Sequence, residues 1–279
     1  MTQPTKKILI TGATAGIGEA TALLLAERKH HLILPVRNLE KAEKVKARLV
    51  EKTGNQAIDL LSCDLASFAS IQEFTKVFNQ QYTQLDVLIN NAGVWQERFE
   101  TSEDGIEKTL AVNHLAPFLL THLLLEKVKQ APQGRIVNVA SDLHQGRVYF
   151  EDIEFKERFS GFKAYRQSKL CNILFTRLLA EKLKETPVTV NALMPGFIAS
   201  SLFRNMNFIL KGIVQLVAKS PKQGAATTVH LATSPEVKTQ SGAYFKDKKV
   251  ANASEASKNM KTAQRLWEVS EAYVKDYLS

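Results

Sequence analysis

The chain has 279 residues, of which 44% are hydrophobic, and a formal net charge of +9. This length and composition suit one large α/β domain with a sizeable core. The excess positive charge indicates a lysine-rich solvated surface, or attraction of a phosphorylated cofactor or an anionic membrane surface. No basic run is interleaved with aromatic residues and no recognition motif occurs, so specific nucleic-acid binding is not expected.

The cysteines and the N-terminal segment bear on location. Cys63 and Cys171 stand in unlike contexts, which predicts reduced thiols and a cytoplasmic protein. No CxxC or His/Cys ligand spacing occurs, so no metal site is predicted. The segment Met1–Lys7 lacks the apolar core of a signal peptide. No uncharged apolar run reaches the roughly 20 residues of a membrane span.

Hydrophobic periodicity predicts alternating strands and helices along the whole chain. In the first half these are the strand Ile8–Ile10, the helix Ile17–Leu25, the strand Leu32–Val36, the helix Leu39–Lys52, the strand Ile58–Cys63, the helix Ser67–Asn79, the strand Val87–Ile89 and the helix Ser102–Lys129, with a kink or break at Pro117. In the second half they are the strand Ile136–Val139, an irregular loop Gly146–Phe162, the helix Tyr165–Glu185, the strand Val188–Leu193, a helix from Pro221, the strand Gly242–Phe245 and a helical tail from Ala256.

Strands joined by helices imply a parallel sheet with right-handed crossovers. The prediction is a single-domain Rossmann-type doubly wound parallel sheet of about seven strands, with helices on both faces. Ligands of such sheets bind at the carboxyl ends of the strands. We expect a cofactor half at about residues 1–145 and a catalytic and substrate half at about residues 146–279.

The segment after Pro195 has apolar residues at helical spacing over Leu202–Val217, together with basic residues. Three interpretations stay open for residues 200–219. The segment is a lid over an apolar substrate, a core helix, or a helix with weak contact to a membrane surface.

Two local patterns point to chemistry. The glycines of Gly12-x-x-x-Gly16-x-Gly18 follow the first strand, and a glycine turn between strand and helix can hold a pyrophosphate. Tyr165 and Lys169 are four residues apart and therefore share one face of a helix. A phenol beside an ammonium group exchanges protons nearer neutral pH than a free phenol. Together the patterns predict hydride transfer with a nicotinamide cofactor, with Tyr165 moving the proton.

The sequence resembles the short-chain dehydrogenase/reductase family over essentially its whole length. The family's TGxxxGIG appears as Thr11–Gly18, its NNAG as Asn90–Gly93, its helical asparagine as Asn113, its strand-five serine as Ser141, its YxxxK as Tyr165 and Lys169, and its PG turn as Pro195-Gly196. Stretches such as Asn113–Leu120 and Ser168–Phe175 resemble the retinol dehydrogenase-like branch, which includes relatives of protochlorophyllide reductase.

The resemblance implies roles for four residues. Tyr165 would exchange a proton with the substrate oxygen, and Lys169 would lower the pKa of Tyr165 and bind the nicotinamide ribose. Ser141 would hold the substrate oxygen and stabilise developing charge. Asn113 would help to fix Lys169 and a water that relays the proton.

The resemblance also implies a set of cofactor contacts along the strand ends. They are Gly12, Thr14, Ala15, Gly16, Ile17, Gly18, Asp64, Leu65, Asn91, Ala92, Gly93, Tyr165, Lys169, Pro195, Gly196, Ile198 and Ser200. His114 and His144 lie beside Asn113 and Ser141, and we expect both to be structural.

The choice of cofactor follows from the end of the second strand. An acidic residue there would bind the 2′-hydroxyl of NAD(H). Here Val36 is followed by Arg37 and Asn38, and a guanidinium group pairs well with the 2′-phosphate of NADP(H). The sequence therefore favours NADP(H) over NAD(H).

The leading hypothesis is an NADP(H)-dependent enzyme that interconverts an alcohol and a lipophilic aldehyde or ketone. Reduction of a C=C bond and a non-catalytic NADP(H)-binding sensor are the alternatives. The resemblance also implies a homodimer or homotetramer through the helices Ser102–Lys129 and Tyr165–Glu185, and a monomer is compatible with the sequence as well.

Overall fold

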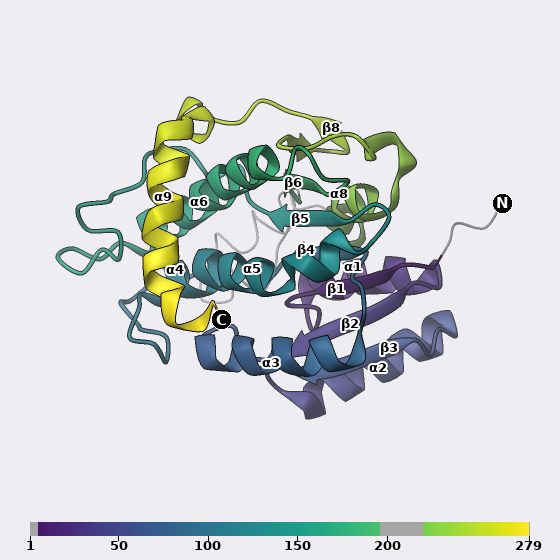
Figure 1. Ribbon diagram of the computed structural model, residues 1–279. Coiled ribbons are helices and arrows are strands. Elements are labelled where there is room, and N and C mark those ends of the chain that lie inside the picture. The colour runs from purple at the N-terminus through teal and green to yellow at the C-terminus, as the bar shows by residue number, and fades with distance from the viewer. Residues whose placement is uncertain (1–4, 196–219, 279) are drawn as a thin grey trace.

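The computed structural model describes residues 5–195 and 220–278, and its strands form one sheet (Figure 1). The strands are β1 (Lys7–Ile10), β2 (His31–Val36), β3 (Ile58–Ser62), β4 (Val87–Asn90), β5 (Arg135–Val139), β6 (Thr189–Met194), β7 (Tyr244–Lys246) and β8 (Lys249–Val250). Their order in the 8-stranded sheet is β3-β2-β1-β4-β5-β6-β7-β8. The predicted fold class is confirmed, and β8 adds a short antiparallel strand to the parallel sheet.

Helices cover both faces of this sheet (Figure 1). They are α1 (Gly16–Glu27), α2 (Leu39–Thr53), α3 (Phe68–Gln81), α5 (Ala116–Lys129), α6 (Gly161–Lys182), α8 (Pro221–Thr233) and α9 (Met260–Val274). Buried side chains of α1, α2 and α8 form one cluster, and those of α3, α5, α6 and α9 form another. Within residues 5–195 and 220–278, no helix combines the length and apolar character that crossing a bilayer requires.

The two clusters meet the sheet through the alternation of side chains along each strand. In β1, Leu9 joins the cluster of α3 and α5, whereas Ile8 and Ile10 join the cluster of α1 and α8. All three side chains are fully buried. A strand that is buried on both faces reads as a continuous apolar run, and this explains why β1 has no polar alternation.

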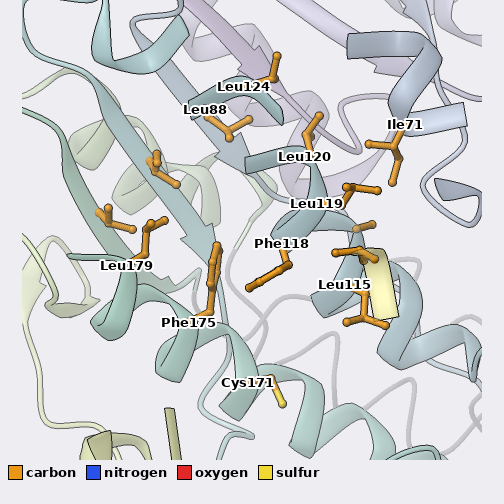
Figure 2. Close-up of a cluster of buried hydrophobic side chains, with 14 of the residues drawn as sticks. Ile71, Leu88, Leu115, Phe118, Leu119, Leu120, Leu124, Cys171, Phe175 and Leu179 are labelled. Carbon is orange, nitrogen blue, oxygen red and sulfur yellow. The ribbon is translucent and has the colours of Figure 1, made fainter. Parts of the chain in front are cut away.

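Aromatic side chains fill the space between α5, α6 and α9. Phe118 of α5 lies 5.4 Å from Phe175 of α6 and 5.1 Å from Trp267 of α9, measured between ring centroids. Figure 2 shows Phe118 and Phe175 facing one another, with Leu115 and Leu119 nearby. The ammonium group of Lys182 lies 4.6 Å from the Trp267 ring centroid on the outer side. The helix α9 therefore closes this cluster from outside.

The helix that we expected from Ser102 begins six residues later, so this predicted start was wrong. The short helix α4 covers Lys108–Leu110. Before it, Gly105 adopts φ +74°, a left-handed conformation that ends regular structure and suits glycine. The side chain of Glu107 then caps the helix by accepting from the backbone N–H groups of Thr109 (2.8 Å) and Leu110 (2.7 Å).

A π-helical stretch, η1 (Ala111–Leu115), joins α4 to α5. The N–H of Ala116 donates to the carbonyl of Ala111, five residues before it. Pro117 follows in the first turn of α5, where the absence of an N–H donor is tolerated. The helix is therefore not broken at Pro117, and its pitch changes before that residue, over Ala111–Leu115. This change of pitch places Asn113 in the π-helical stretch.

Two further boundaries differ from the prediction. The helix α6 begins at Gly161, four residues before Tyr165, and Ser160 caps it by accepting from the N–H of Lys163. At the other end of the sheet, β7 and β8 form a hairpin whose turn residues Asp247 and Lys248 have φ values of +49° and +66°. Positive φ at both turn residues matches the right-handed twist of the paired strands.

Two buried histidines make stability depend on pH. Burial lowers the pKa of His30 and of His114 from 6.5 to about 4. Between these values the unfolded chain binds more protons than the folded chain, so stability falls as the pH falls. We expect the free energy of unfolding to decrease by about 1–2 kcal/mol for each histidine from about pH 7 to about pH 5.

Urea denaturation of the wild type and of His30→Gln at both pH values measures this effect. The variant should lose the share of the pH dependence that His30 contributes. An unchanged pH dependence in the variant would show that His30 titrates normally in the folded protein.

Candidate active site

The first part of the site is the junction between the ends of β1 and β4. The Thr11 hydroxyl donates to the Ile89 carbonyl (3.4 Å) and accepts from the N–H groups of Asn91 (2.9 Å) and Ala92 (3.0 Å). In return, the Asn91 side-chain amide donates to the Thr11 carbonyl at 2.8 Å. The glycine turn and the Asn90–Gly93 turn are therefore fixed to each other.

Glycine is required in this junction because other backbone atoms approach closely. A Cβ atom on Gly12 would lie 2.9 Å from the Cα of Ala92, and Gly12 also has φ +69°. A Cβ atom on Gly18 would lie 2.1 Å from the Gly12 carbonyl oxygen. Gly16 has open space around it, and its φ of +57° is the reason for glycine there. Because positions 12 and 18 are both glycine, the backbone at Gly12 can lie in close contact with the first turn of α1 at Gly18.

The N-terminus of α1 has the character of an anion site. Ala15 precedes the helix and supplies no side-chain cap. The first N–H groups of the helix thus lack the partner that a serine or aspartate would give. Thr14, Gly16 and Ile17 are partly exposed around this helix end. Backbone donors and the helix dipole together favour a phosphate group there.

Arg37 and Asp64 stand side by side where β2 and β3 end, because Val36 pairs with Ser62 in the sheet. The Arg37 Nε lies 3.9 Å from an Asp64 carboxylate oxygen, and the arginine side chain is 72% exposed. An ion pair this long and exposed holds the guanidinium group weakly, which leaves it available to another anion. The Asp64 carboxylate accepts from the N–H of Ala66 at 2.9 Å.

The neighbouring candidates have structural partners. The Asn38 side chain accepts from the N–H of Lys41 (2.8 Å) and caps α2. Leu65 is partly buried and packs on the core cluster of α3 and α5. Both residues therefore help to shape the strand ends beside Arg37.

Ser141, Tyr165 and Lys169 gather at the end of β5. The ammonium group of Lys169 donates to the Val139 carbonyl at 3.0 Å and lies 5.6 Å from the Tyr165 ring centroid. The Ser141 side chain lies beside Tyr165 and acts on its pKa as a hydrogen-bonding neighbour. Tyr165 and Lys169 are both buried. The first turns of α6 thus place a phenol, an ammonium group and a strand-end hydroxyl together.

Burial decides the proton affinities of this group. It raises the pKa of Tyr165 to about 12, and the hydrogen bond with Ser141 acts in the opposite direction. It also lowers the pKa of Lys169 to about 8. The lowering of the Tyr165 pKa by Lys169 stays a prediction, because burial is the largest influence on that pKa here. Desolvation disfavours the charged form of each residue, so the phenol is protonated at neutral pH.

Asn113 links the loop after β4 to α6. Its side chain accepts from the Val94 N–H (2.7 Å) and donates to the Val94 carbonyl (2.9 Å) and to the Ser168 hydroxyl (3.0 Å). A Cβ atom on Gly93 would lie 3.4 Å from the Lys169 ammonium nitrogen and 3.5 Å from the Asn113 carbonyl oxygen. The side chains of Asn113 and Lys169 therefore both approach Gly93. Asn113 connects Val94, in the loop after β4, to Ser168 on α6.

The two histidines near the site have structural roles, as expected. His144 Nδ1 lies 2.6 Å from the Ser141 carbonyl oxygen, and its Nε2 accepts from the N–H of Ser254 at 2.9 Å. This pattern places the proton on Nδ1. His114 Nε2 lies 2.8 Å from the Ser270 hydroxyl oxygen and links η1 to α9.

Sequence reasoning missed two residues of this site. Thr11 binds the two turns together, although it appeared only as the first letter of a motif. Trp95 stacks on the Tyr165 ring with a centroid distance of 4.8 Å and an interplanar angle of 29°. An aromatic residue two positions after the Asn90–Gly93 turn was the available signal. Side-chain stacking across two segments does not follow from sequence spacing.

The predicted site residues otherwise fall into two groups. The residues discussed above follow β1 to β5 in the chain or lie in the helices after these strands. Pro195 follows β6 directly. Gly196, Ile198, Ser200 and the segment 200–219 lie outside the described residues.

Comparison with known proteins agrees with this geometry. A family model described as short chain dehydrogenase matches residues 6–208. Human retinol dehydrogenase 11 is 41% identical over 270 residues, which cover 96% of this chain and 85% of the relative. The chloroplastic short-chain dehydrogenase TIC 32 B of Brassica napus is 39% identical over 277 residues, with coverage of 94% and 86%.

Solved structures share the fold. An uncharacterized protein from Mycobacterium paratuberculosis has a TM-score of 0.79 and 28% identity, covering 98% of this chain and 96% of that one. RhlG of Pseudomonas aeruginosa, solved as a complex with NADP, has a TM-score of 0.72 and 22% identity, with coverage of 87% and 95%. With the sequence motifs at the strand ends, these matches show that the chain belongs to the short-chain dehydrogenase family of oxidoreductases and to its retinol dehydrogenase-like branch.

Proposed function

We propose that the protein is an NADP(H)-dependent oxidoreductase that interconverts a lipophilic alcohol and the corresponding aldehyde or ketone. The observation that carries this proposal is the grouping of Ser141, Tyr165 and Lys169 beside the junction of β1 and β4. The names of the retinol dehydrogenase relatives support a lipophilic substrate.

Bound NADP(H) would supply or accept the hydride. The glycine turn and the N-terminus of α1 would hold its pyrophosphate, and Arg37 would hold the 2′-phosphate. Gly93 leaves room for the Lys169 and Asn113 side chains to meet, and Lys169 can turn a donor toward the ribose. The residues present fit this cofactor because they offer cationic and backbone donors where its phosphates would lie.

Tyr165 acts as the proton donor in the direction of carbonyl reduction. With a pKa of about 12, its hydroxyl carries a proton at neutral pH and can give it to the carbonyl oxygen as that oxygen gains charge. Ser141 donates a hydrogen bond to the same oxygen. In alcohol oxidation, the phenolate must form first. Because burial raises the pKa of Tyr165, alcohol oxidation should be faster at alkaline pH, where more of the phenol is ionised.

We also propose a cytoplasmic location. Cys63 and Cys171 are unpaired buried thiols, and burial raises the pKa of both. Protonated, inaccessible thiols suit a reducing compartment.

The role of Tyr165 is tested by Tyr165→Phe, which removes only the hydroxyl. NADPH-dependent reduction of all-trans-retinal should fall by about 10²–10⁴-fold, because a positioned proton donor is lost. NADPH binding, followed by cofactor fluorescence, should stay within about threefold.

Tyr273→Phe is the matched control, since this tyrosine of α9 donates to Glu154, which lies between β5 and α6. Equal losses in the two variants would contradict the assignment. An α,β-unsaturated ketone assayed beside the aldehyde distinguishes C=O reduction from C=C reduction by its product.

The choice of cofactor is tested by Arg37→Ala. We expect the dissociation constant of NADPH to rise about 10–100-fold, which is the loss of a charge-assisted hydrogen bond to phosphate. That of NADH should change less than threefold, because NADH has no 2′-phosphate. Isothermal titration with both cofactors measures this, and Arg265→Ala on α9 is the control. If the dissociation constants of NADPH and NADH rose equally, Arg37 would not be the residue that binds the 2′-phosphate.

We further propose that the protein is a monomer. The resemblance implied assembly through α5 and α6, but α9 lies across these helices and Trp267 contacts both Phe118 and Phe175. A partner helix could reach this face only if α9 moved.

Light scattering after size exclusion should therefore give a mass near 31.1 kDa. A mass near twice or four times that value at micromolar concentration would contradict this prediction.

A further inference from the structure

The contact between Trp95 and Tyr165 extends along the first turn of α6. Phe162 and Tyr165 are three residues apart and share one side of the helix. The Trp95 ring lies 4.8 Å from the Tyr165 ring and 5.9 Å from the Phe162 ring, measured between centroids. The indole therefore packs against both the tyrosine of the site and its exposed neighbour, since Phe162 is 46% exposed.

The backbone on both sides of Trp95 fixes this position. A Cβ atom on Gly161 would lie 1.9 Å from the Gln96 carbonyl oxygen and 3.3 Å from the Trp95 ring nitrogen. Any side chain at position 161 would thus displace the loop from α6. On the other side, Asn113 holds Val94 through two hydrogen bonds of 2.7 and 2.9 Å. Trp95 is therefore held in place by the close approach of Gly161 on one side and by the hydrogen bonds of the Asn113 side-chain amide to Val94 on the other.

This arrangement creates an apolar surface directly beside the proton donor. The large hydrophobic side chains that are exposed in the described part of the chain are few, and Phe162 is one of them. Trp95 is partly exposed next to it. An exposed aromatic surface that adjoins a buried polar group suits a ligand with one reactive polar end and a hydrocarbon body.

We propose that Trp95 and Phe162 form the wall that binds the hydrocarbon part of the substrate, and that Trp95 also positions the Tyr165 ring. The preferred substrates are accordingly unsaturated or aromatic carbonyl compounds, because planar groups stack well on an indole and a phenyl ring. This inference rests on the proposed function, for which it names the residue that selects the substrate class.

The kinetic test compares Trp95→Ala and Trp95→Phe with all-trans-retinal and propanal as substrates. In Trp95→Ala, kcat/KM for retinal should fall about 10–100-fold, mainly through KM, because the apolar wall is lost. For propanal it should fall less than about tenfold, through kcat, because only the positioning of Tyr165 is affected. Trp95→Phe should restore both values to within about threefold of the wild type.

Phe99→Leu is the matched control. Phe99 lies in the same loop but contacts Phe159, with ring centroids 5.7 Å apart, rather than Tyr165. The control should leave both substrates unchanged. If kcat/KM fell equally for retinal and propanal in Trp95→Ala, or did not fall for either, the proposal that Trp95 binds the hydrocarbon part of the substrate would be wrong.

A binding measurement separates this inference from the proposed reaction. The difference between the tryptophan emission of the wild type and of Trp95→Phe isolates Trp95, while Trp267 is 7% exposed and serves as the internal reference. With NADP⁺ present, the unsaturated aldehyde citral should protect the Trp95 emission from quenching by acrylamide, because an aldehyde and the oxidised cofactor cannot exchange a hydride. If Trp95 is protected from quenching but neither retinal nor propanal is reduced, the proposed reaction is wrong and the proposed substrate-binding surface is supported. If the aldehydes are reduced but Trp95 is not protected, the proposed substrate-binding surface is wrong.

Discussion

The structure depends on one close approach between two backbone segments. The chain turns after β1 and after β4 within hydrogen-bonding distance, and the Thr11 hydroxyl fills the space between the turns with three hydrogen bonds. Each such bond contributes about 1 kcal/mol, yet leaving any of these groups unpaired would cost about 1–3 kcal/mol. Glycine at positions 12 and 18 is a consequence, since a side chain at either position would enter the opposing backbone. The junction lies where the strand order reverses, which is where sheets of this kind bind their ligands.

The rest of the site is connected to this junction by polar contacts. Asn113 ties the loop after Gly93 to Ser168 on α6, so the helix that carries Tyr165 and Lys169 is fixed relative to β4. Under the site, the Asn90 side chain donates to Asn138 at 2.8 Å, and Asn138 donates to Thr176 of α6 at 2.9 Å. These buried bonds join β4, β5 and α6 directly. The positions of Tyr165 and Lys169 relative to the strand ends are therefore fixed by side-chain hydrogen bonds as well as by the backbone.

Much of the fold and of the candidate site was predictable from sequence, because the strands are apolar runs and the motifs depend on local spacing. The alternation of strands and helices fixed the sheet, and the four-residue spacing put Tyr165 and Lys169 on one helix face. The start of the fourth helix was not predictable, since it depends on the positive φ of Gly105 and on capping by Glu107. The pKa of Tyr165 was also beyond reach, because desolvation is set by the whole packed environment. Trp95 was missed because its contact joins two segments that lie 70 residues apart, as 165 − 95.

The β7–β8 hairpin has a consequence for solubility. An open parallel sheet ends in a strand with unpaired N–H and C=O groups, which can template the addition of a strand from another molecule. Here the last strand has only two residues, and its turn bends through two residues with positive φ. Lys249 of this last strand is exposed, so an incoming strand would meet a cation at the edge. The hairpin thus opposes edge-to-edge aggregation at this end of the parallel sheet.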